Sequence, residues 1–337
     1  MKQTQAFLST YTADVSGVCS ALFELGGMTV MHDASGCNST YNTHDEPRWY
    51  DMDSLVYISG LSELEAVMGD DEKLISDVSD AARQLHPRFI ALAGTPIPMI
   101  TGCDLPAIAR EVAGRTNIPS FAVPSNGIGT YVAGAGQALR LYAERFITSR
   151  PEKRKNAVNI LGATPLDFSV NGCVQSMARR IEEAGFTLQS VFAMSSSIDA
   201  IDKAGAAEAN LVISSVGLPA AKYLQAQFGT PYVIGAPFGD FFSPYVFDAL
   251  RESIRTGVPT DVLGAFAPDA PDTIILGESV TAKSLAAALA VGYGIGARVI
   301  CPVEAPGGVL GACDLQLEDE EEIEEALRGA RRVIADP

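Results

Sequence analysis

Short apolar segments alternate with amphipathic segments along most of the chain. In the first half, apolar runs rich in β-branched residues predict strands at Met28–Asp33, Leu55–Gly60, Phe89–Gly94 and Pro119–Pro124. Segments with helical periodicity follow them at Ser39–Trp49, Asp71–Leu85, Leu105–Thr116 and Tyr131–Ser149. Strands that are apolar throughout and alternate with amphipathic helices are typical of parallel sheets covered on both faces.

The alternation restarts after a charged segment, Arg150–Asn156, which we interpret as a linker. Further strands are predicted at Ala157–Gly162, Thr187–Phe192, Leu211–Ser215, Tyr232–Ile234, Thr273–Leu276 and Arg298–Cys301. Further helices are predicted at Val174–Ala184, Pro219–Phe228, Phe241–Thr256, Ala282–Val291 and Glu318–Ile334. The pattern therefore predicts an α/β fold of repeated Rossmann-like parallel-sheet domains: one over residues 1–150, a second over 151–262 and a short third unit over 263–337.

The composition is that of a well-packed globular protein with more than one core. The chain has 337 residues, of which 47% are hydrophobic and 19% charged, and this excludes a disordered chain. Its formal net charge of −17 excludes the basic face that a nucleic-acid or membrane-surface binder needs. The acidity fits solubility; the alternative is a docking surface for a basic partner, such as an electron donor.

The roles open to the cysteines depend on the compartment. The first residues carry no apolar segment typical of a secretory signal, and no stretch approaches the ~20 apolar residues of a membrane helix, so we expect a cytoplasmic protein. The six cysteines should then be reduced, which leaves core thiols, reactive thiols or metal ligands. No CxxC pair is present, so spacing alone predicts no metal site.

Three cysteine-bearing turns follow predicted strands, where Rossmann-like units bind their ligands. They end at Cys37, Cys103 and Cys173. Cys37 follows a glycine and precedes a possible helix, whose N-terminal dipole would lower the pKa of its thiol. Thiolates are the ligands that iron–sulfur clusters require, although a cysteine in a glycine turn is also commonly a small buried residue. Cys301 is interpreted as a core residue and Cys313 as a loop residue.

The segment GVCSALFELGGMTVMHDASGCNSTYNTHDEPRW resembles the N-terminal cluster-binding region of nitrogenase component 1 and its relatives, the protochlorophyllide and chlorophyllide reductases and the nickel-sirohydrochlorin reductive cyclase. In that family a first cysteine opens a helix and a second ends an HGxxGC-like turn; Cys19 and Cys37 stand at those positions here. His44–Pro47 resembles an RHxxEP-like segment, and Thr95–Asp104 a TCxxxxIGDD-like loop. The resemblance implies a nitrogenase component 1-like fold with a reduced third domain, and an iron–sulfur cluster held by Cys19 and Cys37.

The chain departs from the family pattern at the third cysteine, whose position is taken by Pro96. Cys103 lies seven residues later, where the family usually has an acidic residue. In one arrangement Cys19, Cys37 and Cys103 bind one cluster per subunit, with a fourth ligand from a neighbour or solvent. In the other, Cys19 and Cys37 of two symmetry-related chains together bind one 4Fe–4S cluster on the dimer axis. We favour the second arrangement because Cys103 occupies a different position from the family's ligand.

A second departure concerns the catalytic cofactor of nitrogenase itself. Ile213–Ser215 stands where the family member that reduces dinitrogen has its cofactor-binding cysteine, and no histidine lies near the C-terminus. The resemblance therefore predicts neither an iron–molybdenum type cofactor nor dinitrogen reduction. It leaves room for a tetrapyrrole or another small substrate in a cleft between domains.

Two histidines flank the second cysteine turn. His32 and His44 are candidates for proton delivery beside the cluster, since imidazole titrates near neutral pH; the alternative is a structural role in hydrogen bonding. Gly127–Gly129 and Gly134–Gly136 resemble fragments of a dinucleotide fingerprint, but the full spacing is absent.

The resemblance implies an oxidoreductase subunit that forms a homodimer or pairs with a paralogous subunit. Because the chain carries no P-loop motif, an ATP-hydrolysing, nitrogenase-reductase-like iron protein would have to deliver the electrons. The cluster would pass them to a small-molecule substrate. The alternatives are a non-catalytic scaffold or cofactor-maturation protein on the same fold, and a two-lobed small-molecule binding protein. No nucleic-acid or membrane partner is expected.

Overall fold

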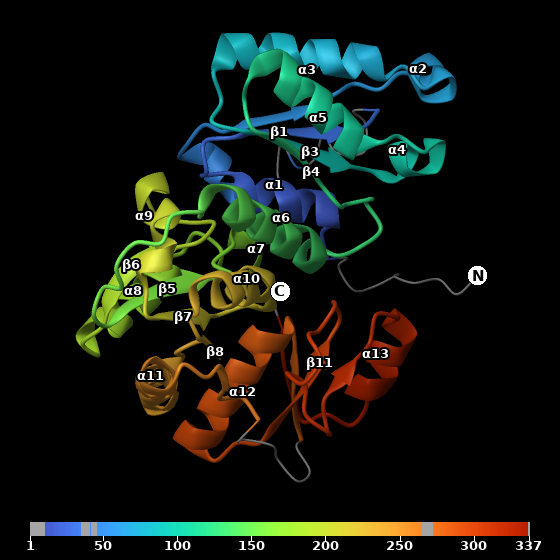
Figure 1. Ribbon diagram of the computed structural model, residues 1–337. Coiled ribbons are helices and arrows are strands. Elements are labelled where there is room, and N and C mark those ends of the chain that lie inside the picture. The colour runs from blue at the N-terminus through green and yellow to red at the C-terminus, as the bar shows by residue number, and fades with distance from the viewer. Residues whose placement is uncertain (1–10, 35–40, 42–45, 265–271, 336–337) are drawn as a thin grey trace. The chain divides into compact units, whose positions relative to one another are not determined.

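Three sheets organise the backbone (Figure 1). The computed structural model describes residues 11–34, 41, 46–264 and 272–335. Every strand pair in the three sheets is parallel, as the alternating pattern predicted. The described chain divides into two compact units, Thr12–Leu141 with Thr164–Val170, and Tyr142–Ala163 with the residues from Asn171 onward. We call them the N-terminal and the C-terminal unit; the predicted boundaries at residues 150 and 262 stay a prediction.

The N-terminal unit contains the sheet with strand order β2-β1-β3-β4. Its strands are β1 Met28–His32, β2 Leu55–Ile58, β3 Ile90–Gly94 and β4 Ser120–Val123. Helices α3 Asp71–Leu85 and α5 Leu105–Thr116 cover one face, and α1 Asp14–Leu22 and α6 Tyr131–Phe146 lie along the other (Figure 1). On the α3/α5 face, apolar side chains from both helices and from β1 and β3 form a buried core cluster.

Helix α1 is buried along its whole length, because it lies against the sheet and also against α6. Glycines allow this close approach: a Cβ on Gly134 would lie 1.9 Å from the carbonyl oxygen of Asp14, and one on Gly17 would lie 2.3 Å from that of Tyr131. The Asp14 carboxylate also accepts the backbone N–H of Gly127, at 2.8 Å. The glycines that resembled a dinucleotide fingerprint thus have a packing role.

The C-terminal unit contains two sheets, β6-β5-β7-β8-β9 and β12-β11-β10-β13. The strands of the first are β5 Ala157–Leu161, β6 Thr187–Val191, β7 Ala209–Val212, β8 Tyr232–Ile234 and β9 Thr260–Asp261. Those of the second are β10 Thr273–Leu276, β11 Ala297–Cys301, β12 Leu315–Gln316 and β13 Arg332–Ile334. The longer helices of the unit are α8 Cys173–Glu183, α10 Leu218–Phe228, α11 Gly239–Thr256, α12 Ser279–Tyr293 and α13 Glu320–Leu327.

The helix predicted over Glu318–Ile334 is wrong in its second half. Helix α13 ends at Leu327, and Gly329 adopts a left-handed backbone with φ 86°, which a helix cannot continue through. The last apolar residues then pair in parallel with β10 as β13. Within α13, Ile323 faces the core and is 3% exposed. Searched over its described helices, the chain has none with the length and apolar character needed to span a bilayer.

A buried ion pair joins α12 to the loop before β12. Lys283 Nζ lies 2.7 Å from Asp314 Oδ2, with both side chains almost completely buried. The same carboxylate accepts the backbone N–H groups of Val299, at 2.9 Å, and Gly311, at 2.7 Å. Because a buried charge is tolerated only when it is paired and hydrogen-bonded, this carboxylate fixes the loop against β11.

We expect Asp314→Asn to destabilise the protein, because Lys283 would keep a buried charge without its counter-ion. Removing one partner of such a pair costs about 3–5 kcal/mol, whereas Asp248→Asn, which breaks the exposed pair with Arg251, should cost less than about 1 kcal/mol. Urea unfolding at pH 7 measures both free energies. Equal losses in the two variants would contradict the assigned role of Asp314.

Candidate functional site

Side-chain hydrogen bonds join the carboxyl ends of three neighbouring strands of the N-terminal unit. Thr95, directly after β3, places its Oγ1 2.8 Å from the carbonyl oxygen of His32 and 3.0 Å from Asp33 Oδ1. His32 Nδ1 lies 2.8 Å from Ser59 Oγ, which also accepts the backbone N–H of Asp33 at 3.1 Å. In a parallel sheet this is the edge where ligands bind, and it is where the predicted cysteine turns also begin.

Cys19 lies inside α1 rather than at its start, and its side chain is completely buried. Burial, with a smaller contribution from the Glu46 carboxylate, raises the pKa of its thiol far above the ordinary value. Burial, followed by the nearby Cys19 sulfur, raises the pKa of Tyr41 well above its ordinary value. A thiol in this environment stays protonated unless a bound cation stabilises the negative charge of the thiolate. A metal ion supplies such a positive charge to a cysteine that binds it.

The segment after the second cysteine turn is anchored to α1 by a buried carboxylate. Glu46 Oε1 accepts from Arg48 Nε at 2.7 Å, and Glu46 Oε2 accepts from Ser20 Oγ at 2.9 Å. Arg48 donates further to the carbonyl oxygen of Ser20, at 2.7 Å, and to Glu24, at 3.0 Å. Its guanidinium also lies 4.5 Å from the ring centroid of Phe23. Glu46 and Arg48 both belong to the segment Glu46–Pro47–Arg48, which ends the family-like stretch. The motif was thus the signal that could have identified Arg48 as a functional residue.

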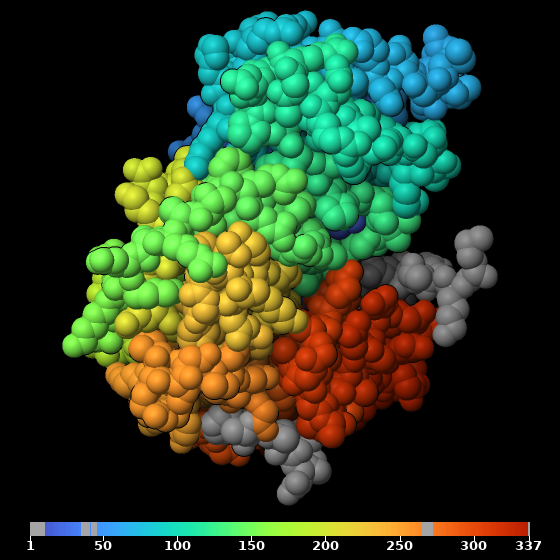
Figure 2. Space-filling view, in the orientation of Figure 1, coloured from blue at the N-terminus to red at the C-terminus, as the bar shows by residue number. Residues whose placement is uncertain are grey.

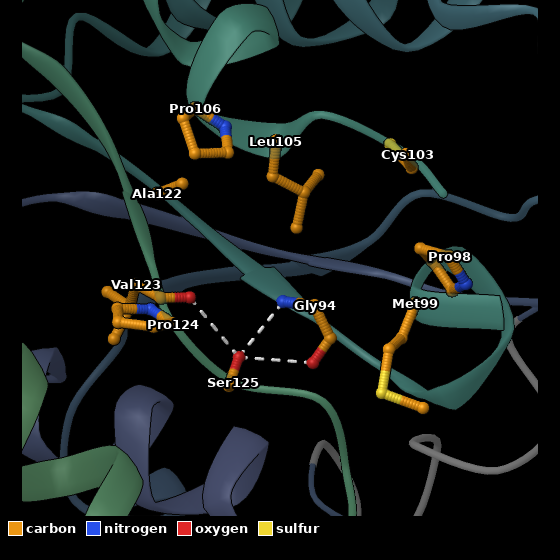
Figure 3. Close-up of a pocket in the computed structure, with 10 residues that line it drawn as sticks. All are labelled: Gly94, Pro98, Met99, Cys103, Leu105, Pro106, Ala122, Val123, Pro124 and Ser125. Carbon is orange, nitrogen blue, oxygen red and sulfur yellow. Dashed lines mark hydrogen bonds between the residues drawn. The ribbon is translucent and has the colours of Figure 1, made fainter. Parts of the chain in front are cut away.

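Cys103 lines a pocket of about 400 Å³ at the carboxyl ends of β3 and β4 (Figure 3). The lining residues are Gly94, Pro98, Met99, Cys103, Leu105, Pro106, Ala122, Val123, Pro124 and Ser125. The half-buried thiol donates to Asp71 Oδ1 over 3.8 Å. Burial, followed by the carboxylates of Asp71 and Asp104, raises the pKa of Cys103 to about 12.

Cys19 and Cys103 lie on opposite faces of the same sheet. Cys103 packs against the core cluster beneath α3 and α5, whereas α1, which carries Cys19, lies on the other face (Figure 1). Over the described ranges, no three His, Cys, Asp or Glu side chains are close enough together to hold a metal ion. Cys37 and His44 lie outside the described residues, so both cluster arrangements stay predictions.

Pro96, which takes the position of the family's third cysteine, has a structural role. It begins helix α4 Pro96–Thr101 with Thr95 as the preceding cap residue. A Cβ on Gly127 would lie 2.4 Å from Pro96 Cδ, so the proline ring fits closely against the loop that follows β4. The residue that removes a possible ligand therefore helps to join the β3 and β4 loops.

The remaining cysteines lie in the C-terminal unit. Cys173 is the first residue of α8 and half-buried, and burial raises the pKa of its thiol. Cys301 is buried at the end of β11, as expected for a core residue, and its thiol donates to the carbonyl oxygen of Val303 over 3.3 Å. Cys313 lies beside Asp314, with 3.9 Å between the sulfur and Oδ1.

His32 is 6% exposed, and burial lowers the pKa of its imidazole although the carboxylates of Asp71 and Asp33 act in the opposite direction. Its folded pKa is therefore below the reference value of 6.5, and the unfolded chain binds the proton more readily. Stability from this residue is fully present above pH 6.5 and falls as the pH drops through it. At neutral pH the ring is uncharged, so it can accept a proton more readily than donate one.

We therefore expect the wild-type protein to lose more unfolding free energy between pH 7.5 and pH 5.5 than a His32→Gln variant. His86→Gln serves as the matched control, because His86 is exposed at the end of α3. Urea unfolding at the two pH values measures the difference. A His32→Gln variant with the full wild-type pH dependence would contradict the assignment of a neutral buried imidazole.

Comparison with known proteins gives a consistent result. The family model of nitrogenase component 1 type oxidoreductases matches residues 16–279. The chain is 28% identical over 196 residues to the nitrogenase iron-molybdenum cofactor biosynthesis protein NifE of Methanosarcina barkeri, a match that covers 54% of this chain and 42% of that protein. It is 35% identical over 181 residues to a subunit of the light-independent protochlorophyllide reductase of Nostoc punctiforme, covering 51% of this chain and 36% of that protein. Each match thus spans less than half of the relative's length.

The solved structure titled nitrogenase Cp1 at pH 5 shares the fold. The two structures superpose with a TM-score of 0.65 at 16% sequence identity, and the match covers 96% of this chain and 72% of the solved chain. The predicted α/β fold of nitrogenase component 1 type is thereby confirmed.

Proposed function

This chain belongs to the nitrogenase component 1 type oxidoreductase family, and on that premise we propose that it is an iron–sulfur oxidoreductase subunit. It accepts electrons from an ATP-dependent, nitrogenase-reductase-like iron protein and passes them through a cluster to a small substrate in a cleft between domains. It works in the cytoplasm, as a homodimer or with a paralogous subunit. The observation that carries the proposal is the Glu46–Arg48 anchor, because it joins the helix of Cys19 to the segment that follows Cys37.

The short segment between Cys37 and Tyr41 supports the proposal that Cys19 and Cys37 bind the same cluster. Tyr41 lies close enough to Cys19 for a charge on that sulfur to raise the pKa of the tyrosine, and only four residue steps separate Tyr41 from Cys37. Four residues span at most about 14 Å of extended chain. A segment of this length is short enough for Cys19 and Cys37 to serve one cluster, as the proposal requires.

The cluster in this proposal is a 4Fe–4S cluster shared between two chains, with Cys19 and Cys37 of each as ligands. Iron would supply the positive charge that keeps the buried Cys19 as a thiolate. The position of Cys103 on the opposite face supports leaving it out of the ligand set. A two-fold axis brings the same patch of two chains together, which gives four thiolates from two per chain.

We expect Cys19→Ser and Cys37→Ser each to remove most of the iron from anaerobically reconstituted protein, while Cys103→Ser keeps it. Cys313→Ser, in the other unit, is the matched control for loss of one half-buried thiol. Iron content per chain and the visible absorbance of the cluster are the measurements. Loss of most iron in Cys103→Ser would contradict the shared cluster, and colourless wild-type protein would contradict the proposed function.

An exposed apolar surface on α2 and α4 is the proposed docking site for the iron protein. Helix α2 Glu63–Met68 buries none of its residues, and Leu64, Val67 and Met68 are 72%, 77% and 73% exposed. Ile100 of the neighbouring α4 is 78% exposed. Figure 2 shows α2, in blue, projecting from the molecular surface. Contiguous exposed apolar side chains of this kind mark interaction surfaces.

Charge selects the class of partner for this surface. Carboxylates lie on α2 and directly after it, at Glu63, Glu65, Asp70, Asp71 and Glu72. Of these, Glu65 is paired with Lys73 and Glu72 with Arg115. A second copy of the same surface would bring these carboxylates together, and this costs free energy. A partner with an apolar centre and a basic rim fits better.

We expect Val67→Glu to slow electron transfer from an iron protein encoded beside this chain by about tenfold or more, because a charge would be buried at the interface centre. Val258→Glu, at a 57% exposed position in the C-terminal unit, is the control. Cluster reduction followed by stopped-flow absorbance gives the rate, at equal iron content. A Val67→Glu rate equal to the control rate would place the docking site elsewhere.

A second candidate function is a scaffold or cofactor-maturation protein. The similarity to the cofactor biosynthesis protein of Methanosarcina barkeri favours it. Cluster transfer to an acceptor protein, without substrate reduction in the presence of the iron protein, would decide for this alternative.

The proposal includes no iron–molybdenum type cofactor. At the end of β7, Ser214 and Ser215 are buried, at the position where the resemblance places the cofactor ligand of nitrogenase. The backbone N–H of Ser215 donates to Glu278 Oε1 at 3.2 Å. The same carboxylate accepts the first N–H groups of α12. The carboxylate of Glu278 therefore occupies this position. The hydroxyls of Ser214 and Ser215 are also poor substitutes for a thiolate ligand.

A further inference from the structure

We propose that the pocket beside Cys103 is a binding site for a small, uncharged, largely apolar molecule, and that it functions independently of the cluster. The pocket lies wholly within the N-terminal unit, between the loops that follow β3 and β4 (Figure 3).

The size and rigidity of the pocket suit a ring-sized ligand. Its volume of about 400 Å³ is within the range of about 300–1,000 Å³ typical of ligand sites. A cavity of about 150 Å³ already holds one benzene molecule, so one or two rings fit here. Pro98, Pro106 and Pro124 contribute rings whose backbone φ is fixed. A pocket with such walls loses little conformational entropy when a ligand binds.

The two polar side chains of the wall already have hydrogen-bond partners. Among the lining residues only Cys103 and Ser125 have a polar side chain. The Ser125 hydroxyl accepts the backbone N–H of Gly94 at 2.9 Å and lies 3.1 Å from its carbonyl oxygen, as the dashed lines in Figure 3 show. A polar ligand would thus find no unused polar side chain to replace its hydrogen bonds to water, and losing them costs free energy.

Cys103 makes the pocket unfavourable for anions. Its thiol faces the carboxylates of Asp71 and Asp104, which both disfavour negative charge at the sulfur. The same field disfavours an anionic ligand that touches the thiol. A protonated sulfur is soft and polarizable, and it makes favourable contacts with aromatic rings. The ligand class is therefore an uncharged aromatic or aliphatic ring compound.

The test uses the full-length protein without its cluster, so that binding here is measured apart from the proposed electron transfer. The probe is 4-fluorotoluene, with 4-fluorobenzoate as its anionic counterpart, and fluorine NMR titration gives both dissociation constants. We expect the neutral probe to bind at least about tenfold more tightly than the anion, a difference of about 1.4 kcal/mol. Equal affinities, or tighter binding of the anion, would overturn the proposal.

The pocket itself is tested by filling it. Ala122→Leu adds apolar volume to the wall, and Ala133→Leu makes the same change at an exposed position of α6. We expect at least about tenfold weaker binding of 4-fluorotoluene in the first variant and wild-type affinity in the second. Wild-type affinity in a folded Ala122→Leu variant would overturn the assignment of the site.

A measurement on the wild-type protein covers the case in which Ala122→Leu does not fold. Iodoacetamide alkylates free thiols, and mass spectrometry reports each cysteine separately. We expect 4-fluorotoluene to slow alkylation of Cys103 several-fold while leaving that of Cys313 unchanged, because only the first thiol lines the pocket. Unchanged alkylation of Cys103 at a saturating probe concentration would overturn the proposal.

Discussion

The buried carboxylate of Glu46 is the interaction on which the site of the N-terminal unit depends. It receives hydrogen bonds from Ser20 on α1 and from Arg48 and Tyr41 on the segment before β2. A carboxylate that is 1% exposed needs these donors, because an unpaired buried charge costs several kcal/mol. The arrangement that satisfies the charge also fixes Glu46 and Arg48 against α1, so an electrostatic requirement determines where the segment before β2 meets that helix.

The parallel sheet adds a second constraint. All connections after its strands begin at one edge, which brings His32, Thr95 and Ser125 to that edge although they are far apart in sequence. The sheet also separates two faces, and this divides the two described cysteines of the unit: Cys19 belongs to the α1 face and Cys103 to the α3/α5 face. The two thiols therefore have different surroundings and, in our proposals, different functions.

Particular elements show why some predictions agree with the structure and others do not. The helices Asp71–Leu85 and Leu105–Thr116 have the predicted bounds, because their apolar periodicity coincides with local end signals, such as the Asp104 side chain that accepts the N–H of Ala107. Helix α2 was not predicted, since its apolar side chains face solvent and form no inward stripe. The last helix was predicted to continue to Ile334, but the left-handed backbone of Gly329 prevents a helix from continuing through it.

The sequence by itself determined the parallel α/β architecture, because alternation of buried strands and amphipathic helices is a local property that each segment carries alone. The family resemblance led to Cys19, Cys37 and Cys103 as candidate ligands, and to the segment that contains Glu46. Only the tertiary structure decided that Cys19 is completely buried, that Cys103 faces a pocket, and that Glu46 pairs with Arg48 beneath α1. These features depend on contacts between segments that are distant along the chain, and no local pattern of residues specifies which of them will meet.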